Sequence, residues 1–265
     1  MEEHALLGAP PSARGCLDLT AEALLWLQRA VRDASCYACC FEAEGVYHEI
    51  NEEFGGVEYL HRQPDVIAVH GFLSDEECDR LREKAEGKLK PCGTYDSDGR
   101  RQPRNSNRTS SEALVTQREV PTIIAKLTAL LRCTPEQLQT LNVVRYTAGQ
   151  QFKPHCDASS GRCSRIEHGF VRSTRLVSVL VYLNSPRRGG KTIFPWFNMS
   201  IQPCKGTALL HFPASLSYHH DPRTLHSGAP AIEDKWILVT WMWYHPRDPS
   251  LMDEANVPEL SSSRI

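Results

Sequence analysis

The residues best suited to chemistry in this sequence are His155 and Asp157, which are separated by Cys156 alone. They end a stretch, residues 151–157, that is predicted to form a β-strand. Because successive side chains of a strand point to opposite faces, His155 and Asp157 share a face and Cys156 points away. An imidazole and a carboxylate on one face supply two ligands of the 2-His-1-carboxylate triad, which binds non-haem Fe(II) and leaves coordination positions open. The pair therefore predicts a metal site that a distant histidine completes.

The candidate for this third ligand is His226, in the sequence Leu-His-Ser-Gly-Ala-Pro. The other histidines have less favourable surroundings. A histidine in the middle of a strand is usually a core residue with its hydrogen bonds satisfied. His168, His219 and His220 lie in polar or glycine-rich stretches, and His211 lies in the middle of a predicted strand.

Lys235 is a second candidate, because it opens the apolar run KWILVTWMWY. Alternation along a strand would place Lys235 on one face with Ile237, Val239, Trp241 and Trp243. A lysine among such residues is costly to bury unless an anion pairs with it. A carboxylate-bearing cofactor would be such an anion. The alternative is that Lys235 precedes the strand and reaches water.

The bulk composition limits the partners. The formal net charge is −2, so no general basic field attracts nucleic acid or a membrane. No apolar run approaches the roughly 18–20 residues of a membrane-spanning helix, and the N-terminus does not resemble a signal peptide. We therefore expect no nucleic-acid or membrane partner and a cytoplasmic or nuclear location. A cluster of Cys36, Cys39 and Cys40 lacks a second pair at zinc-finger spacing, so ordinary thiols are favoured over a metal site.

Helices are predicted mainly in the first half of the chain. Residues 20–34 place apolar side chains at three- and four-residue steps, which is typical of an amphipathic helix. Ser74 begins a second helix, because Ser74 and Glu77 have the spacing of a capping box. Pro121 suits the first turn of a third helix.

From Leu141 onward the sequence changes to short β-branched and aromatic runs that are broken by Gly, Pro and Asn. This order predicts an α+β fold in which two β-sheets form the core and N-terminal helices buttress it. The predicted divisions are an N-terminal extension (1–62), a main domain (63–247) with its core at 141–245, and a C-terminal tail (248–265). Strands are predicted over residues 66–69, 141–147, 151–157, 175–183, 191–195, 206–213 and 235–244.

Residues 143–244 resemble the catalytic domain of the prolyl 4-hydroxylases, a family of Fe(II)- and 2-oxoglutarate-dependent dioxygenases. Six blocks occur in the order that the family shows. They are Arg145-Tyr146-x-x-Gly149-Gln150-x-Phe152-x-x-His155-x-Asp157, Val179–Asn184, Gly189–Pro195, Pro203-x-Lys205-Gly206-x-Ala208-Leu209, Leu225-His226-Ser227-Gly228-x-Pro230 and Lys235-Trp236-x-x-x-x-Trp241.

The resemblance implies a double-stranded β-helix, also called a jelly roll or cupin-like fold, with Fe(II) near one open end. It also implies that O2 and 2-oxoglutarate are cosubstrates, that succinate and CO2 are products, and that ascorbate supports turnover. By the resemblance, the iron ligands are His155, Asp157 and His226; the 2-oxoglutarate-binding residues are Lys235, Tyr146 and Thr192; and the residues near the substrate are Arg175 and Trp241.

Several functions stay open at this point. The favoured reaction is hydroxylation of peptidyl proline, with a peptide groove that residues 91–112 and 158–172 cover. The alternatives are hydroxylation of a free amino acid or another small molecule, a non-catalytic interaction protein that keeps the fold, and a cupin-type enzyme that uses a different metal. Imidazole and carboxylate ligands also accept Mn, Co, Ni or Zn.

Overall fold

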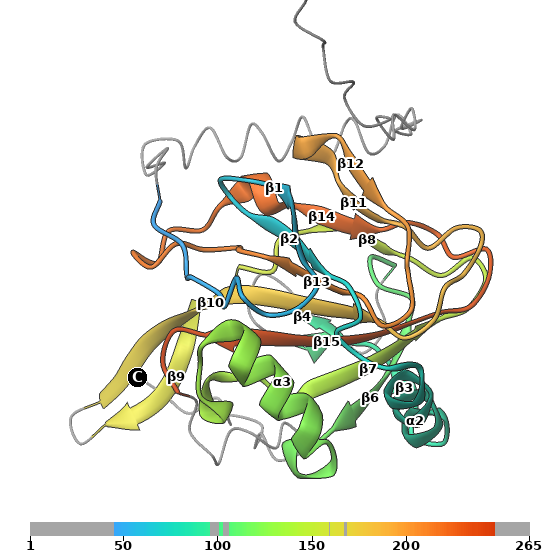
Figure 1. Ribbon diagram of the computed structural model, residues 1–265, viewed down its shortest axis with the longest axis horizontal. Helices are drawn as coiled ribbons and strands as arrows, with labels where there is room; N and C mark the ends of the chain where they lie inside the picture. The colour runs from blue at the N-terminus through green and yellow to red at the C-terminus, as the bar shows by residue number, and fades with distance from the viewer. Residues whose placement is uncertain (1–44, 96–100, 103–105, 159, 167–168, 247–265) are drawn as a thin grey trace, which may run out of the picture.

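A computed structural model describes residues 45–95, 101–102, 106–158, 160–166 and 169–246 of the 265-residue chain. The predicted helix at 20–34, the Cys36 cluster and the predicted tail at 248–265 lie outside these residues. Two facing β-sheets dominate the described part, and the helices lie against one of them (Figure 1).

The larger sheet contains nine strands. They are β1 (Val57–His61), β2 (Val66–Val69), β3 (Lys90–Pro91), β6 (Ser111–Val115), β7 (Leu141–Tyr146), β9 (Ser160–Ile166), β10 (Gly169–Tyr182), β13 (Ala208–His211) and β15 (Lys235–Trp243). Their order is β1-β2-β13-β10-β15-β7-β6-β3, and β9 pairs with β10 off this path.

The smaller sheet contains four strands in the order β12-β11-β14-β8. They are β8 (Phe152–His155), β11 (Thr192–Phe194), β12 (Met199–Ile201) and β14 (His226–Gly228). A separate pair consists of β4 (Thr94–Tyr95) and β5 (Arg101–Gln102). The pairings within both main sheets are antiparallel. This arrangement confirms the predicted α+β class with a double-stranded β-helix core.

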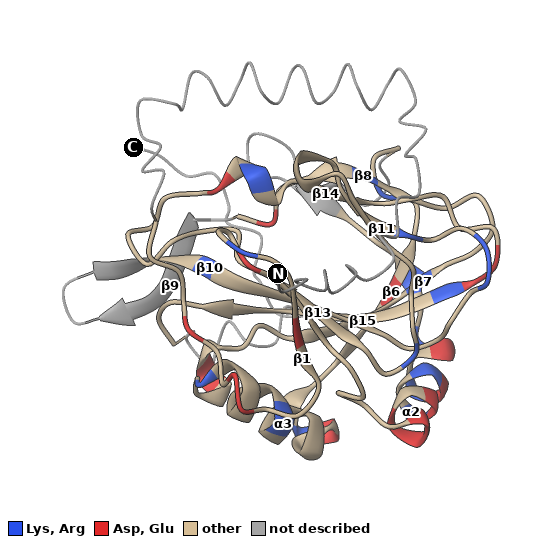
Figure 2. Ribbon diagram, turned by 45° about the horizontal axis from the view of Figure 1, so that its top comes forward, with Lys and Arg blue, Asp and Glu red and all other residues tan. Residues whose placement is uncertain are grey.

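The helix α2 (Asp75–Glu86) begins where the sequence predicted, because the Ser74 side chain accepts from the Glu77 backbone and the Glu77 side chain accepts from the Ser74 backbone. Acidic residues fill its first turn and Lys84 lies in its last turn, so the helix has negative side chains at its N-terminal end and a positive one at its C-terminal end (Figure 2). The helix α3 (Pro121–Leu131) also starts at its predicted proline. The short 3-10 helices are η2 (Gln117–Glu119), η3 (Pro135–Gln137), η4 (Pro195–Phe197) and η5 (Pro222–Thr224).

The two faces of β10 belong to two different clusters of buried side chains. Val177, Val179 and Val181 belong to the cluster that includes the apolar faces of α2 and α3. Tyr182 belongs to a second cluster, which includes Phe194 of the smaller sheet. The helices therefore buttress the outer face of the larger sheet, and its inner face is left for the cavity between the sheets.

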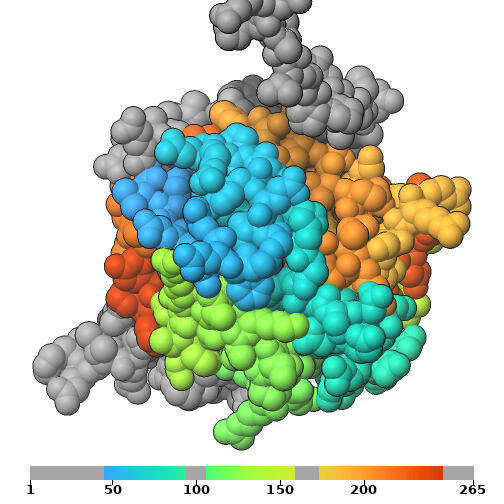
Figure 3. All heavy atoms as spheres, in the orientation of Figure 1, coloured from blue at the N-terminus to red at the C-terminus, as the bar shows by residue number. Residues whose placement is uncertain are grey.

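The described part of the predicted N-terminal extension, residues 45–62, packs on this frame. Its strand β1 pairs with β2, and the Asn51 backbone N–H donates to the carbonyl oxygen of Leu130 at the end of α3 (2.8 Å). In the space-filling view these residues, in blue, lie next to the green surface that includes α3 (Figure 3). None of the helices in the described ranges has the length and apolarity that crossing a membrane requires.

Candidate active site

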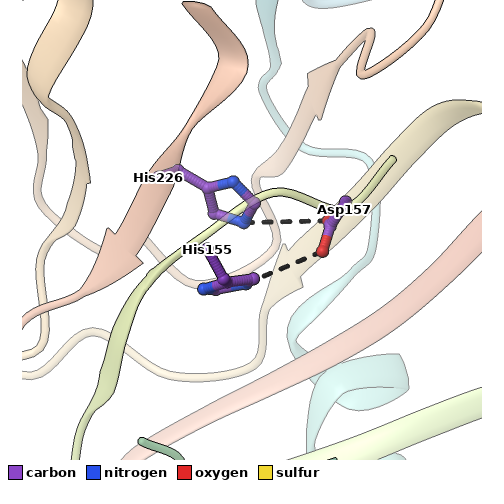
Figure 4. A group of neighbouring side chains, drawn as sticks. All are labelled: His155, Asp157 and His226. Atoms are coloured by element: carbon purple, nitrogen blue, oxygen red, sulfur yellow. Dashed lines mark ion pairs between the residues drawn. The ribbon is translucent and has the colours of Figure 1, made fainter. Parts of the chain in front are cut away.

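The structure brings His155, Asp157 and His226 together (Figure 4). His155 ends β8, and His226 begins β14 directly opposite it. The Nε2 atoms of His155 and His226 lie 3.6 and 3.7 Å from the carboxylate oxygens of Asp157. Cys156 is exposed and Asp157 is buried, as the alternation predicted. One candidate ligand atom from each of the three residues lies within 4.8 Å of the others.

Backbone carbonyls hold both histidine rings. Nδ1 of His155 lies 2.8 Å from the Lys153 oxygen, and Nδ1 of His226 lies 3.1 Å from the Thr224 oxygen. A carbonyl oxygen only accepts hydrogen bonds, so Nδ1 carries the proton in each ring and the Nε2 lone pair is left for a metal. Metal-binding histidines are usually oriented in this way. The three residues therefore fit a divalent ion such as Fe(II) in both donor type and orientation.

The site also favours the protonation states that bind metals. Burial, with a contribution from neighbouring His226, lowers the pKa of His155 to about 3. Burial alone would raise the pKa of Asp157, but the nearby charges of His226, His155, His211 and Arg175 hold it below its usual range. A neutral imidazole and an ionised carboxylate are the forms that coordinate a metal.

Lys235 lies in the same cavity as the triad. It opens β15 opposite Tyr146 of β7 and is only 2% exposed, so it does not reach water. Burial lowers the pKa of Lys235 to about 7. A Cβ atom on Gly190, whose φ is +65°, would lie 3.1 Å from Cδ of Lys235, so glycine leaves room for the lysine stem.

The remaining wall of the cavity is largely apolar. Ile237, Val239 and Trp241 line it on the same face of β15 as Lys235. Trp243, the last of this alternating set, is not among the lining residues, and its Nε1 donates to Oε1 of Gln139 (3.0 Å). The predicted 2-oxoglutarate residues Tyr146 and Thr192 both line the cavity. The Tyr182 hydroxyl donates to Oγ1 of Thr192 at 2.8 Å.

Arg175 and Trp241, the predicted substrate-side residues, contact each other. The Arg175 guanidinium lies 4.0 Å from the centroid of a Trp241 ring, which is a cation–π distance. Arg175 also donates to the Asp157 carbonyl oxygen (3.4 Å) and to Oε1 of Gln139 (3.0 Å). Trp241 lines the cavity directly, whereas Arg175 supports Trp241 and the backbone of Asp157.

Two cavity residues were missed from the sequence. His211 was assigned to the core, but its Nε2 lies 3.5 Å from Oδ2 of Asp157. His211 and Leu209 share a face of β13, and both line the cavity. A polar side chain on that face was the signal in the sequence that could have indicated His211. Arg108 belongs to residues 91–112, which were predicted only to cover a peptide groove; its guanidinium lies 5.0 Å from the centroid of the Phe152 ring, and Arg108 lines the cavity.

A buried cluster outside the cavity supports His226 through η5. The Asp221 carboxylate caps this helix and accepts from the Arg223 backbone (3.0 Å), the Arg223 guanidinium (2.7 Å) and the Tyr47 hydroxyl. The Thr224 hydroxyl donates to the Asp221 carbonyl oxygen (2.7 Å). Asp221 therefore fixes the turn whose Thr224 carbonyl oxygen orients His226.

We expect Asp221→Ala to destabilise the protein by about 2–3 kcal/mol, because Arg223 and Tyr47 lose a charged acceptor. We also expect metal affinity to fall about 10-fold to 100-fold, since His226 loses its support. Thermal unfolding and Co(II) titration would measure the two effects. Tyr47→Phe is the control, since it removes the hydroxyl that donates to Asp221 and accepts from Arg223 but leaves the Asp221 cap in place. Equal Co(II) affinity in Asp221→Ala and the wild type would refute the supporting role.

Comparisons with known proteins agree with this geometry. Residues 141–243 match the family model of the 2OG-Fe(II) oxygenase superfamily. Probable prolyl 4-hydroxylase 6 of Arabidopsis thaliana is 34% identical over 209 residues, which cover 70% of this chain and 71% of the relative. Probable prolyl 4-hydroxylase 7 of the same plant is 30% identical over 208 residues, which cover 70% and 65%.

A solved structure is also similar. It is the viral collagen prolyl hydroxylase of Paramecium Bursaria Chlorella virus-1 in complex with 2OG, with a TM-score of 0.52 and 25% identity. The match covers 67% of this chain and 95% of the viral one. The double-stranded β-helix and its matched motifs define the class: this chain is a 2OG-Fe(II) oxygenase, which implies Fe(II), 2-oxoglutarate and O2. Within this class, the identity and coverage of its plant relatives show that it belongs to the prolyl 4-hydroxylase family.

Proposed function

We propose that this protein hydroxylates peptidyl proline and couples the reaction to the conversion of 2-oxoglutarate to succinate and CO2. The observation that carries the proposal is that one cavity is lined by the His155, Asp157 and His226 triad and also by the buried amine of Lys235. A dicarboxylate with one end at the metal and the other at Lys235 fits this arrangement.

In this proposal the chain's own residues bind and orient 2-oxoglutarate. The Lys235 ammonium pairs with the distal carboxylate, and the hydroxyls of Tyr146 and Thr192 hydrogen-bond it. The apolar residues Ile237 and Val239 line the wall that excludes water, which strengthens the charge pair. When bound, Fe(II) with O2 and 2-oxoglutarate supplies the oxidising power to hydroxylate an unactivated C–H bond. Ascorbate is proposed as the reductant that keeps the iron in the ferrous state.

The substrate class is inferred from the relatives, which are named prolyl 4-hydroxylases and, for the solved structure, a collagen prolyl hydroxylase. Trp241 lines the cavity, and the Arg175 guanidinium lies against its ring. We assign Trp241 to contact with the target residue and Arg175 to positioning it. The peptide groove that residues 91–112 and 158–172 would cover stays a prediction.

We expect proline-containing peptides to stimulate succinate release from 2-oxoglutarate by the Fe(II)-loaded protein, and one peptide to gain 16 Da. Free L-proline would be tested in parallel, with mass spectrometry of both products. Release that requires free proline and ignores every peptide would favour the small-molecule hydroxylase. Release that no added substrate increases would leave the oxygenase chemistry in place and contradict the peptidyl substrate.

A further inference from the structure

His211 lines this cavity, and the proposed chemistry gives it no role. It ends β13, opposite Ser178 of β10 on one side and Val66 of β2 on the other. Strand pairing on both sides fixes its backbone in the middle of the larger sheet. The side chain is 4% exposed and lines the cavity. A buried imidazole is costly unless its polar atoms are hydrogen-bonded.

The His211 ring faces the metal-binding side chains rather than the apolar core. Its centroid lies 4.4 Å from that of His226, at an interplanar angle of 60°. Phe194 makes an edge contact with His211 (5.3 Å) and a stacked contact with His226 (5.4 Å), so one aromatic ring fixes both imidazoles. The Nε2 atom of His211 is buried and has no hydrogen-bond partner among the described residues.

The Nε2 atom of His211 lies close to the carboxylate of Asp157, which is proposed to bind the metal. Nε2 of His211 lies 3.5 Å from Oδ2 of Asp157. A movement of about half an ångström would bring the two atoms to a normal N–H···O distance of about 3.0 Å. His155 and His226 cannot donate in this way, because their Nδ1 atoms carry the proton and face backbone carbonyls.

His211 does not have the position of a fourth ligand. Among the described side chains, the group whose candidate ligand atoms all lie within 4.8 Å of one another contains His155, Asp157 and His226, and His211 is outside it. A carboxylate that binds a metal through one oxygen is usually hydrogen-bonded at the other. His211 is placed to supply that bond.

We propose that His211 is a positioning residue of the metal centre, whose Nε2–H donates to one oxygen of Asp157 and so holds the other oxygen toward the ion. The inference rests on the proposed metal-binding role of His155, Asp157 and His226. It adds a fourth side chain to the centre, on a different strand and in the facing sheet.

The test is titration of the metal-free full chain with Co(II), followed by absorption of the d–d bands and by calorimetry, without substrate. His211→Leu removes the donor, and His211→Gln replaces it with an amide N–H. We expect His211→Leu to lose about 10-fold to 100-fold in Co(II) affinity and His211→Gln to recover most of the loss. His48→Leu is the matched control, since it removes a partly buried histidine that lies 2.6 Å from the Leu131 oxygen, outside the cavity. If His211→Leu does not fold, His211→Phe takes its place.

Each result decides the role of His211. Unchanged Co(II) affinity in the apolar variant would overturn the proposal, and so would equal losses in the apolar and glutamine variants. If the d–d bands of His211→Leu showed that Co(II) had one ligand fewer, His211 would be a ligand itself, and its proposed role as a positioning residue would be wrong. His155→Ala in the same titration tests the centre itself: if that variant binds Co(II) as tightly as the wild type, the proposed metal site fails, and the His211 proposal fails with it.

Discussion

The His155→Ala variant is expected to lose metal affinity and succinate release together, each by more than about 100-fold. Loss of a residue that only supports a ligand typically costs about 10-fold to 100-fold, and loss of a ligand should cost at least the upper value. The remaining imidazole and carboxylate cannot supply the two-histidine triad. Calorimetric titration with Co(II) and mass spectrometry of succinate would measure the two quantities on the same preparation.

His70→Ala is the matched control for this variant. His70 is exposed, pairs with Glu58 at 2.6 Å and is not among the cavity-lining residues, so both quantities should stay at wild-type values. Full metal affinity in His155→Ala would place the metal elsewhere and contradict the site. If metal binding and turnover vanished while a cellular function of the protein persisted, the chain would act as an interaction protein that keeps the fold.

Much of the fold was predictable because its signals are local. The Ser74 capping box and Pro121 each specify a helix start through backbone groups within one turn. The strand predicted at 141–147 appears as β7, and the strand predicted at 235–244 appears as β15, since both segments are rich in β-branched and aromatic residues. The strand predicted at 175–183 is part of β10, which begins earlier, at Gly169.

Short strands were not predictable in the same way. β14 has only three residues, His226–Gly228, which is too few to show a period. Its conformation is set by pairing with β8 on one side and β11 on the other. β12 and β6 were missed for the same reason, because cross-strand partners that are distant in sequence decide whether such segments become strands.

The same distinction between local signals and contacts of distant segments applies to the candidate site. His155 and Asp157 were found because alternation along the strand predicted at 151–157 places both on one face. In the structure β8 ends at His155, so Asp157 follows the strand, but its side chain still lies beside that of His155. The role proposed for His211 depends on the register between β13 and β10 and on the distance between the two sheets, neither of which a strand's own sequence records. The carbonyl oxygens of Lys153 and Thr224, which orient the two ligand histidines, carry no side-chain signal.

The Lys235→Met variant is expected to change two properties in opposite directions. Its 2-oxoglutarate affinity should fall about 100-fold, because removing one partner of a buried charge pair costs about 2–5 kcal/mol. The ligand-free protein should become more stable, because a cation with no anion beside it is costly to bury. Calorimetric titration with 2-oxoglutarate and urea unfolding of the ligand-free protein would measure the two changes. Lys191→Met, which removes an exposed lysine near Gly190, should alter neither.

The pH dependence of the free energy of unfolding tests whether Lys235 is the reason that ligand-free Lys235→Met is more stable than the wild type. Burial lowers its pKa from 10.5 to about 7, so below pH 7 the lysine is charged in the folded and unfolded chains and the full burial cost is present. Between pH 7 and 10.5 the folded chain releases the proton and the unfolded chain retains it, so wild-type stability rises with pH. The advantage of Lys235→Met, on the order of 5 kcal/mol at most, should therefore be largest at pH 6 and shrink toward pH 10. An advantage that did not vary with pH, or a variant that bound 2-oxoglutarate normally, would show that Lys235 is not the buried cation that receives the distal carboxylate.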